Sequence, residues 1–365
     1  MSSMPLKVGF LINPYAGSGG RTGEKGSDRK RTINPETEGR ITRFFNTAPK
    51  YPVYFTPRLN MGEFFLRKNG VNYRVIDAGG NDTTAEDTKK SVRLMIKENV
   101  SIIVFAGGDG TARDVWSTIE EIGIDVPILG IPTGVKMHSG VFAESPEAAG
   151  LLLAHFLEGK TMEESTDIMD VDEVLYREGI YKVVSFYKAL TVRFGLLSVP
   201  PKSEVPLDDV EGAVDFVVDN IKDSTFYVMG TGKTVKEIER KLGYNDINYL
   251  SVDLFLGKRL LKKGVSYLDL LEMTKRREVF IVLTPIGGQG FIFGRGNQEI
   301  GPEIIKRASW SNVIVLSSYS KIKGIPCLRV DTGDPMIDRT LNVMKVVVGY
   351  NEYFSVGVCN KYNHP

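Results

Sequence analysis

The sequence is poor in cysteine and has no excess of charge of either sign. Its two cysteines, Cys327 and Cys359, lie far apart and form no Cys-x-x-Cys pair. This excludes a disulfide scaffold or a thiolate zinc site as the organising principle, and it fits a cytoplasmic location. The 46 Lys and Arg residues nearly balance the 45 Asp and Glu residues. No basic field therefore exists to hold a polyanion, and we expect no nucleic-acid partner.

Long apolar runs are also missing. No apolar stretch approaches the length needed to cross a bilayer, and the run at residues 8–12 is too short for a signal peptide. We therefore expect a soluble protein without a membrane partner.

The chain has the composition of an ordinary globular protein and the length of two domains. It contains 365 residues, of which 42% are hydrophobic and 25% charged. Short apolar runs alternate with segments of helical period, which predicts βαβ units and a mainly parallel sheet. The first strands are expected at residues 7–13, 73–80, 101–108 and 126–133. We predict a Rossmann-like α/β domain over residues 1–160.

A second domain is predicted over residues 161–365. The pattern of residues 166–199 has the short period of alternating strands, as in a β-hairpin. Strands and helices then follow one another again. We expect a β-rich or mixed α+β lobe, and we allow for its last segment packing back on the first domain. Residues 21–50 are polar and charged, which indicates a long loop that is either a lid over a site or an inert insertion.

Glycine clusters follow five of the apolar runs. Glycine lets a backbone approach a phosphate closely, and a helix that follows offers unpaired N–H groups. The alternative is that each cluster is only a tight turn. The clusters lie at residues 13–20, at 107–111, at 130–134 with Lys136 and His138 behind, at 230–234 and at 287–297.

Two familiar phosphate-binding motifs do not fit these clusters. Gly232-Lys233-Thr234 has the form of a P-loop tail, but the first glycine of that motif would fall at Tyr227, inside a predicted strand. Residues 17–20 do not complete the dinucleotide-binding fingerprint, because its third glycine would be Thr22. We therefore expect neither a P-loop enzyme nor a standard Rossmann dehydrogenase.

Asp109 stands inside the cluster Gly107-Gly108-Asp109-Gly110-Thr111. A carboxylate among phosphate-binding amides would repel a phosphate unless it has a chemical role. It could accept the proton of an attacking hydroxyl group or engage Mg²⁺ that bridges phosphates. Both roles belong to phosphoryl transfer. The alternative is that Asp109 only caps the helix that follows.

These motifs resemble those of a kinase superfamily. The GGDGT string after a strand resembles the hallmark of the superfamily of NAD kinases and diacylglycerol and sphingosine kinases, and Asn13-Pro14 with Gly17 resembles its first phosphate loop. The string at residues 130–143 resembles the third motif of this superfamily, and the string at residues 284–305 is similar to the branch of ATP-NAD kinases and AcoX-like proteins. The resemblance covers most of the chain.

The resemblance implies an NAD kinase-like enzyme. It would transfer a phosphoryl group from ATP or polyphosphate, with Mg²⁺, to a hydroxyl of NAD, giving NADP. The small-molecule partners would be nucleotides, and a homo-oligomer is expected. The alternatives are a kinase of the same fold acting on another alcohol, such as a polyol or a lipid head, and a nucleotide-binding sensor without turnover.

Residue roles follow the same motifs. Asp109 would activate the acceptor hydroxyl. The phosphates would lie against the glycine-rich turns and the polar residues beside them, namely Asn13, Gly17, Gly107, Gly108, Gly110, Thr111, Gly134, Lys136, His138, Gly232, Thr234 and Arg295. Ordinary NAD kinases hold the adenosine ribose with an Asn-Glu or Asn-Asp pair, which has no clear counterpart here, so Asn297, Gln298 and Glu299 are candidates by their chemistry alone.

Overall fold

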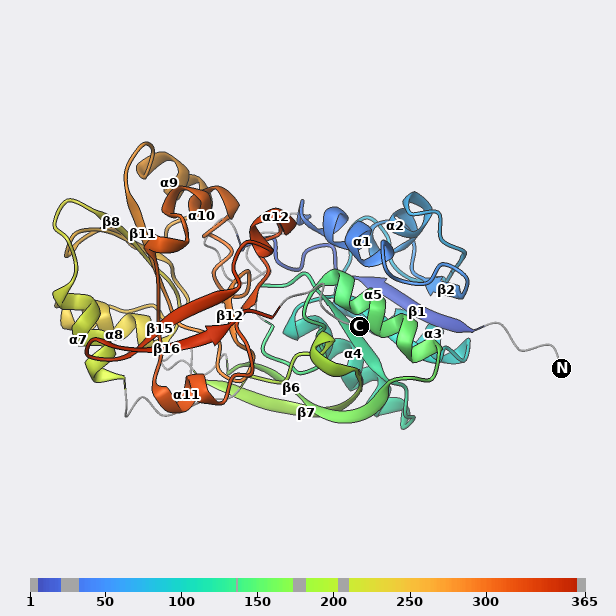
Figure 1. The fold of residues 1–365 in the computed structure, drawn as a ribbon. Helices are drawn as coiled ribbons and strands as arrows, with labels where there is room; N and C mark the ends of the chain where they lie inside the picture. The colour runs from blue at the N-terminus through green and yellow to red at the C-terminus, as the bar shows by residue number, and fades with distance from the viewer. Residues whose placement is uncertain (1–5, 21–32, 136, 173–181, 203–209, 360–365) are drawn as a thin grey trace. The chain divides into compact units, whose positions relative to one another are not determined.

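The computed structural model describes residues 6–20, 33–135, 137–172, 182–202 and 210–359. The chain forms two compact units, with the division at Pro201–Lys202 (Figure 1). Unit 1 contains the described residues up to Ser18 and from residue 33 to Pro201, and unit 2 contains Gly19, Gly20 and the described residues from Lys202 onward. Within the described part of the chain, no helix is long and apolar enough to cross a membrane.

Unit 1 is built on a seven-stranded sheet in the order β3-β2-β1-β4-β5-β7-β6. All neighbouring strands are parallel except β6, which is antiparallel to β7. The four predicted strands are confirmed, and β2 is an addition that the sequence analysis missed. The strands are β1 (Lys7–Ile12), β2 (Val53–Thr56), β3 (Tyr73–Val75), β4 (Ile102–Gly107), β5 (Ile128–Pro132), β6 (Met162–Val171) and β7 (Val183–Arg193).

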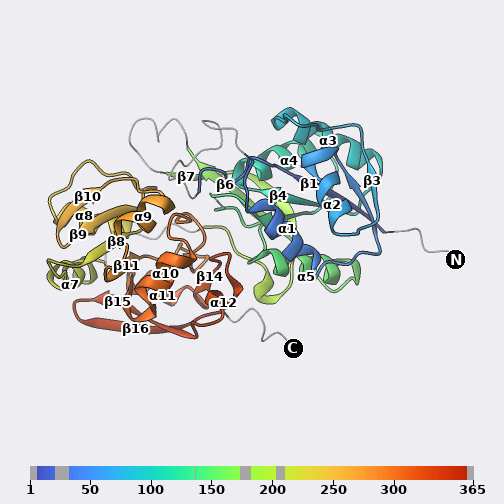
Figure 2. The ribbon, with the colours of Figure 1, turned by 90° about the horizontal axis from the view of Figure 1, so that it is seen from above.

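Helices cover both faces of this sheet (Figure 2). On one face α1 and α5 bury Phe44 and Leu152, and on the other α3 and α4 bury Val92 and Val115. The helices are α1 (Thr37–Phe45), α2 (Glu63–Lys68), α3 (Ala85–Lys97), α4 (Asp109–Ile122) and α5 (Pro146–Leu157), with the short 3₁₀ turns η1 (Leu59–Met61) and η2 (Gly195–Leu197).

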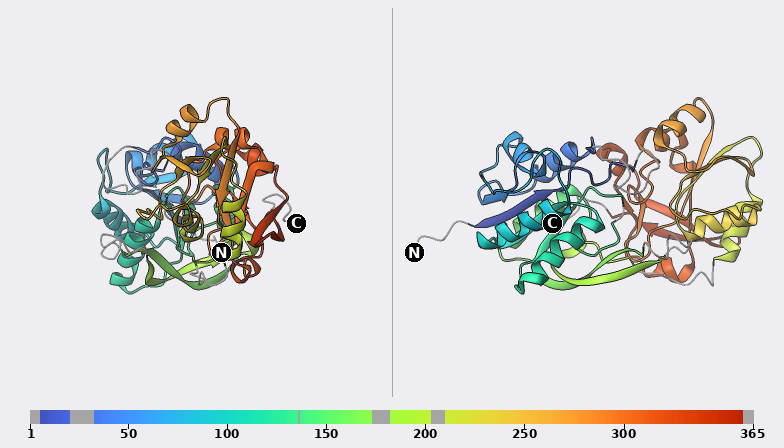
Figure 3. Two further views of the ribbon diagram at one scale, coloured as in Figure 1. Left: turned by 90° about the vertical axis from the view of Figure 1, so that its left-hand side faces the viewer. Right: turned by 180° about the vertical axis from the view of Figure 1, so that it is seen from behind.

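Two expectations about unit 1 need correction. Residues 37–45 form helix α1 rather than a loop, because Ile41, Phe44 and Phe45 recur at helical spacing and are buried. Residues 21–32 of the predicted loop lie outside the described residues. The β6–β7 hairpin (green in Figure 3) was predicted correctly but placed in the second domain. It pairs with β5 through Thr191, so unit 1 continues beyond residue 160 to Pro201.

Unit 2 has its own seven-stranded sheet, in the order β10-β9-β8-β11-β13-β15-β16. The central strands β8, β11, β13 and β15 are parallel, and the strands at both edges are antiparallel. The bounds are β8 (Phe226–Met229), β9 (Asp253–Leu256), β10 (Arg259–Lys262), β11 (Val279–Leu283), β13 (Val313–Leu316), β15 (Val343–Gly349) and β16 (Glu352–Gly357), with a separate parallel pair of β12 (Phe291–Phe293) and β14 (Arg329–Val330).

The helices of unit 2 again lie on both faces of the sheet. Val214 of α7 and Val235 of α8 belong to one hydrophobic core, whereas Leu270 of α9 and Ile304 of α10 belong to the other. The last strands, β15 and β16, are part of this sheet. The helices are α7 (Glu211–Asp219), α8 (Lys233–Lys241), α9 (Tyr267–Met273), α10 (Pro302–Ala308), α11 (Tyr319–Lys323) and α12 (Pro335–Asp338), with the 3₁₀ turn η3 (Trp310–Asn312).

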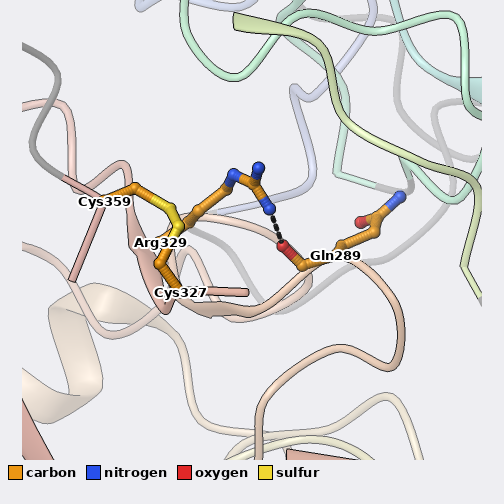
Figure 4. The surroundings of a disulfide bond; sticks show 4 residues. All are labelled: Gln289, Cys327, Arg329 and Cys359. Atoms are coloured by element: carbon orange, nitrogen blue, oxygen red, sulfur yellow. Dashed lines mark hydrogen bonds between the residues drawn. A yellow bond between two sulfur atoms is a disulfide. The ribbon is translucent and has the colours of Figure 1, made fainter. Parts of the chain in front are cut away.

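The two cysteines form a disulfide bond. The Cα atoms of Cys327 and Cys359 lie 5.3 Å apart, although the residues are separated by 32 positions. Backbone pairing brings them together, because Cys359 N donates to Leu328 O at 2.8 Å. Figure 4 shows the bond beside Arg329, whose Nη1 donates to the carbonyl of Gln289. The cysteine spacing did not predict this bond, and the bond removes the support that cysteine usage lent to a reducing compartment. The two sheets and their cores remain the basis of the fold.

Candidate functional site

The first glycine-rich turns meet at the carboxyl edge of the unit 1 sheet. Asn13 follows β1 and Gly108 follows β4, two neighbouring strands whose following helices cover opposite faces. This is the topological switch point, where open α/β sheets bind their ligands. Asn13 Nδ2 donates to Thr111 Oγ1 at 3.0 Å, which fastens the two turns to each other.

Asp109 is the first residue of α4, and its carboxylate is buried, with 1% of the residue exposed. The backbone N–H groups of His138 and Ser139 donate to it at 2.8 and 3.0 Å, and Ser139 Oγ donates at 2.6 Å. His138 Nδ1 lies 3.1 Å from Oδ2. Asp109 therefore holds the loop after β5, some thirty residues along the chain.

These donors determine the charge of Asp109. Burial alone would raise the pKa of its carboxyl group, but hydrogen bonds from His138 and Ser139 and the charge of the imidazole outweigh burial and lower the pKa below its ordinary value. The carboxylate is thus ionised at neutral pH. It is a buried negative charge stabilised by backbone amides, a hydroxyl and an imidazole.

Three glycines of this edge are required by the packing of the chain itself. A Cβ on Gly17, whose φ is +78°, would lie 2.2 Å from Thr133 O. A Cβ on Gly107 would lie 2.5 Å from the side chain of Thr111, and one on Gly134 would lie 2.4 Å from Gly108 Cα. At these positions glycine lets the three turns touch one another, which is the purely structural alternative of the sequence analysis.

Gly110 is different, because it is exposed and an added Cβ would meet no atom within 4 Å. The packing of the chain therefore does not require glycine there. Gly110 lies one residue after Asp109, on the open side of the turn, where a ligand could approach the backbone closely.

Three residues that were not predicted from the sequence hold this edge. Ser139 binds Asp109, Asn34 Nδ2 donates to Ala16 O at 2.9 Å, and Arg40 Nη1 donates to Pro132 O at 2.9 Å. Each binds a turn far away in the sequence. Only Arg40 left a signal, since a cation lies next to Ile41 on the buried face of α1. His138 is buried and contacts Asp109 as described, whereas Lys136 lies outside the described residues.

The predicted residues of unit 2 lie around the carboxyl edge of the second sheet. Gly232, with a φ of +99°, begins α8 after β8, and Thr234 is buried in the first turn of that helix. Tyr227 lies within β8, so the P-loop is excluded as predicted.

Arg295 and Asn297 make contacts that the sequence did not predict. The guanidinium carbon of Arg295 lies 3.9 Å from the centre of the Phe291 ring. The glycines on both sides, with φ of +86° and +75°, turn the loop back over β12. Asn297 uses its amide within the same loop, accepting from Gly294 N at 3.1 Å and donating to Ile292 O at 2.9 Å. These bonds shape the loop and engage one donor hydrogen and one acceptor lone pair of the Asn297 amide.

The predicted residues therefore fall into two sets. The structure brings together those of unit 1 around Asp109, and those of unit 2 surround a different sheet edge. The first set is Asn13, Gly17, Gly107, Gly108, Asp109, Gly110, Thr111, Gly134 and His138, and the second is Gly232, Thr234, Arg295 and Asn297.

A metal site built by the protein alone is not part of this edge. Among the described residues, no three His, Cys, Asp or Glu side chains are grouped so that they could bind a metal ion. The oxygens of Asp109 already accept several hydrogen bonds. These residues fit a Mg²⁺ ion that arrives with the phosphates of its substrate, since Mg²⁺ keeps several waters and needs only one or two carboxylates.

Comparison with known proteins identifies two matching family models. Residues 8–161 match the ATP-NAD kinase N-terminal domain, and residues 222–357 match the ATP-NAD kinase C-terminal domain. Among curated proteins, none matches the chain closely enough to count as a relative. The two models together cover most of both units.

Proposed function

The chain belongs to the ATP-NAD kinase family, and on this premise we propose that it transfers a phosphoryl group from ATP or polyphosphate to a hydroxyl of NAD, giving NADP. The observation that carries the proposal is the buried, ionised carboxylate of Asp109 among backbone amides at the topological switch point. Such a charge is stable only because the loop residues His138 and Ser139 compensate it.

In the proposed reaction the acceptor oxygen attacks the γ-phosphorus of ATP, which enters as its Mg²⁺ complex. The proton of the hydroxyl passes to Asp109, and the bond between the γ-phosphorus and the bridging oxygen breaks, leaving ADP with that electron pair. The ionised state of Asp109 suits a proton acceptor, and the amides at the start of α4 suit the transferred phosphoryl group. Because its donors lower the pKa, Asp109 would act mainly by orienting the hydroxyl until charge develops in the transition state.

A second candidate function has one observation in its favour. The carboxylate of Asp109 is occupied by the loop after β5, which is what a structural anchor would also do. A nucleotide-binding protein without turnover could therefore use the same edge, and a kinase acting on another alcohol would share it as well. We retain both as alternatives to the NAD kinase.

The test is to incubate the protein with ATP, Mg²⁺ and NAD and to measure NADP with an NADP-specific dehydrogenase. We expect NADP to form, and Asp109→Asn to lower the rate by about a thousandfold or more, as expected for a group that acts on the reacting atoms. Asp114→Asn on the same helix is the matched control and should retain the rate. Thermal unfolding of each variant shows whether the fold is retained.

The outcomes separate the candidates. Equal rates for Asp109→Asn and wild type would contradict the assigned role. Nucleotide binding without NADP formation would direct the search to other hydroxyl acceptors, and nucleotide binding without consumption of ATP for any alcohol would favour the sensor. We also propose a cytoplasmic location, because ATP is one of the two proposed donors.

A further inference from the structure

Lys321 lies at the carboxyl edge of the unit 2 sheet. It is in α11, directly after β13, and its Nζ donates to Thr284 Oγ1 at 3.1 Å. Thr284 is the residue after β11, the parallel neighbour of β13. The ammonium group therefore lies where two adjacent parallel strands end, a position at which α/β sheets bind ligands.

The charge of Lys321 has no counter-charge among the described residues. Among the described residues, the ammonium group makes one hydrogen bond, which goes to a neutral hydroxyl group, and the charged side chain that acts on it is Lys202, which repels it. Lys236 on α8 provides an internal comparison. That lysine is fully buried, but Glu239 and Asp253 each lie 2.6 Å from its Nζ. The chain thus supplies two carboxylates to one lysine and none to the other.

The surroundings of Lys321 disfavour its charge. Burial, and secondly the repulsion by Lys202, lower the pKa of Lys321 to about 7. Below that pH the ligand-free protein carries a cation that its surroundings disfavour, at a free-energy cost. A bound anion would supply the missing charge and raise the pKa again.

Two further turns reach the same place. A Cβ on Gly232 would lie 3.1 Å from Thr284 Cγ2, so the turn between β8 and α8 packs directly against Thr284. Gly296 lies close to Thr231 of this turn, since a Cβ added to Gly296 would lie 3.7 Å from Thr231 Oγ1. Glycine leaves the backbone of these turns accessible, and the start of α8 adds the positive end of a helix dipole.

We propose that Lys321 and Thr284, together with the Gly230–Gly232 turn, bind a phosphate group of a nucleotide substrate. Lys321 supplies the charge and Thr284 a hydroxyl that can rotate to donate to the phosphate. The identification of the phosphate carrier as a nucleotide rests on the proposed function. The binding of a tetrahedral oxyanion does not depend on it.

The test uses sulfate as the probe, because its charge stays constant between pH 6 and 9. Isothermal titration of the full chain should show binding that Lys321→Met weakens about tenfold or more and Thr284→Val about threefold, in line with the loss of one charged and one neutral hydrogen bond. Lys323→Met, an exposed lysine on the same helix, is the matched control and should bind as wild type.

The pH dependence gives a second readout that a purely structural role would not produce. Sulfate affinity of the wild type should fall as pH rises through 7, because Lys321 loses its proton. Lys321→Arg keeps its charge over this range, so its affinity should change little with pH. This variant also tests the proposal if Lys321→Met does not fold.

Three results would overturn the inference: no sulfate binding by the wild type, equal binding by Lys321→Met, or the same pH dependence in Lys321→Arg and wild type. The proposed kinase activity can fail separately. Lys321-dependent sulfate binding without NADP formation would sustain the site and reject the function. If Lys321→Met forms NADP with unchanged KM for ATP and NAD and also binds sulfate as wild type does, the site is rejected and the proposed function is retained.

Discussion

The carboxyl edges of the two sheets carry opposite charges and differ in how those charges are balanced. In unit 1 the buried charge is the carboxylate of Asp109, and the loop at His138 and Ser139 surrounds it with donors. In unit 2 the charge is the ammonium group of Lys321, for which the described residues supply one hydroxyl group and no carboxylate. Both edges follow from parallel strands and glycine-rich turns.

The difference shows that similar topology does not determine the electrostatics of a sheet edge. An edge whose charge is satisfied by its own chain is rigid and ready before any ligand binds. An edge whose charge is unsatisfied is destabilised by that charge until an anion binds. Changes at the two edges should therefore have opposite effects on stability.

The largest effect is expected for Asp109→Asn. An asparagine cannot accept all the donors of His138 and Ser139, so we expect a loss of about 3 kcal/mol in the free energy of unfolding at pH 7, in addition to the loss of activity. Urea unfolding measures it. Because the native pKa is lowered, this stabilisation is present above the unfolded pKa and disappears as pH falls through the native value, so the two proteins should converge in acid. A difference that persists unchanged at low pH would contradict this account.

The next effect is expected at Gly134, where packing requires glycine. Gly134→Ala places a Cβ 2.4 Å from Gly108 Cα, which we expect to cost about 2 kcal/mol in stability through backbone displacement. Gly110→Ala is the matched variant, since its Cβ meets no atom within 4 Å and should leave the stability within about 0.5 kcal/mol. If a ligand approaches Gly110, its alanine variant should lose nucleotide affinity in a titration while Tm is unchanged. Equal stability losses in both variants would reject the distinction between the glycines.

Lys321→Met should change the stability in the opposite direction and stabilise the ligand-free protein. Because the pKa of Lys321 is lowered to about 7 in the native state, its charge costs stability below that pH, and the cost is relieved as pH rises towards the unfolded pKa of lysine. We expect the ligand-free Met variant to be more stable than wild type by about 1.5 kcal/mol at pH 6, with the difference shrinking by pH 9. Urea unfolding at both pH values, with Lys323→Met as control, measures it. A less stable Met variant at pH 6 would show that Lys321 is already compensated.

The smallest effect concerns the lysine that has counter-charges. Burial raises the pKa of Glu239 to about 7, even though Lys236 lowers it, because Asp253 shares the same site. The native state therefore holds a proton that the unfolded state has lost, and this stabilisation declines as pH rises through 7. Between pH 5.5 and 8, the free energy of unfolding of wild type should fall by about 1 kcal/mol more than that of Glu239→Gln. Glu237→Gln on the same helix is the control, and parallel pH profiles for all three proteins would contradict the assignment.

Local patterns in the sequence predicted much of the fold and the position of the first site. Alternating apolar runs located the β6–β7 hairpin and most strands, and the GGDGT string located Asp109 at the end of β4. These features depend on neighbours in the chain, which periodicity and turn chemistry report directly. Helix α1 was missed because a polar composition hid the spacing of its three buried apolar residues.

Contacts between distant residues could not be read in the same way. The donors of Asp109 lie about thirty positions away, and nothing local marks Ser139 as one of them. The hairpin was assigned to the wrong domain because its pairing with β5 is a long-range contact. The clash that requires glycine at position 134 involves Gly108, so sequence alone could not separate it from a ligand-binding glycine such as Gly110 is proposed to be.

The disulfide bond affects the order in which the strands of unit 2 unfold. It closes a covalent ring that contains β14, α12, β15 and β16, so the last two strands cannot peel away freely from one edge of the sheet. Opening should then begin at the opposite edge, where β10 pairs with β9 across an irregular register. Amide hydrogen exchange would record this as faster exchange at Arg259–Lys262 than at Val343–Gly349, and reduction of the bond should narrow the difference.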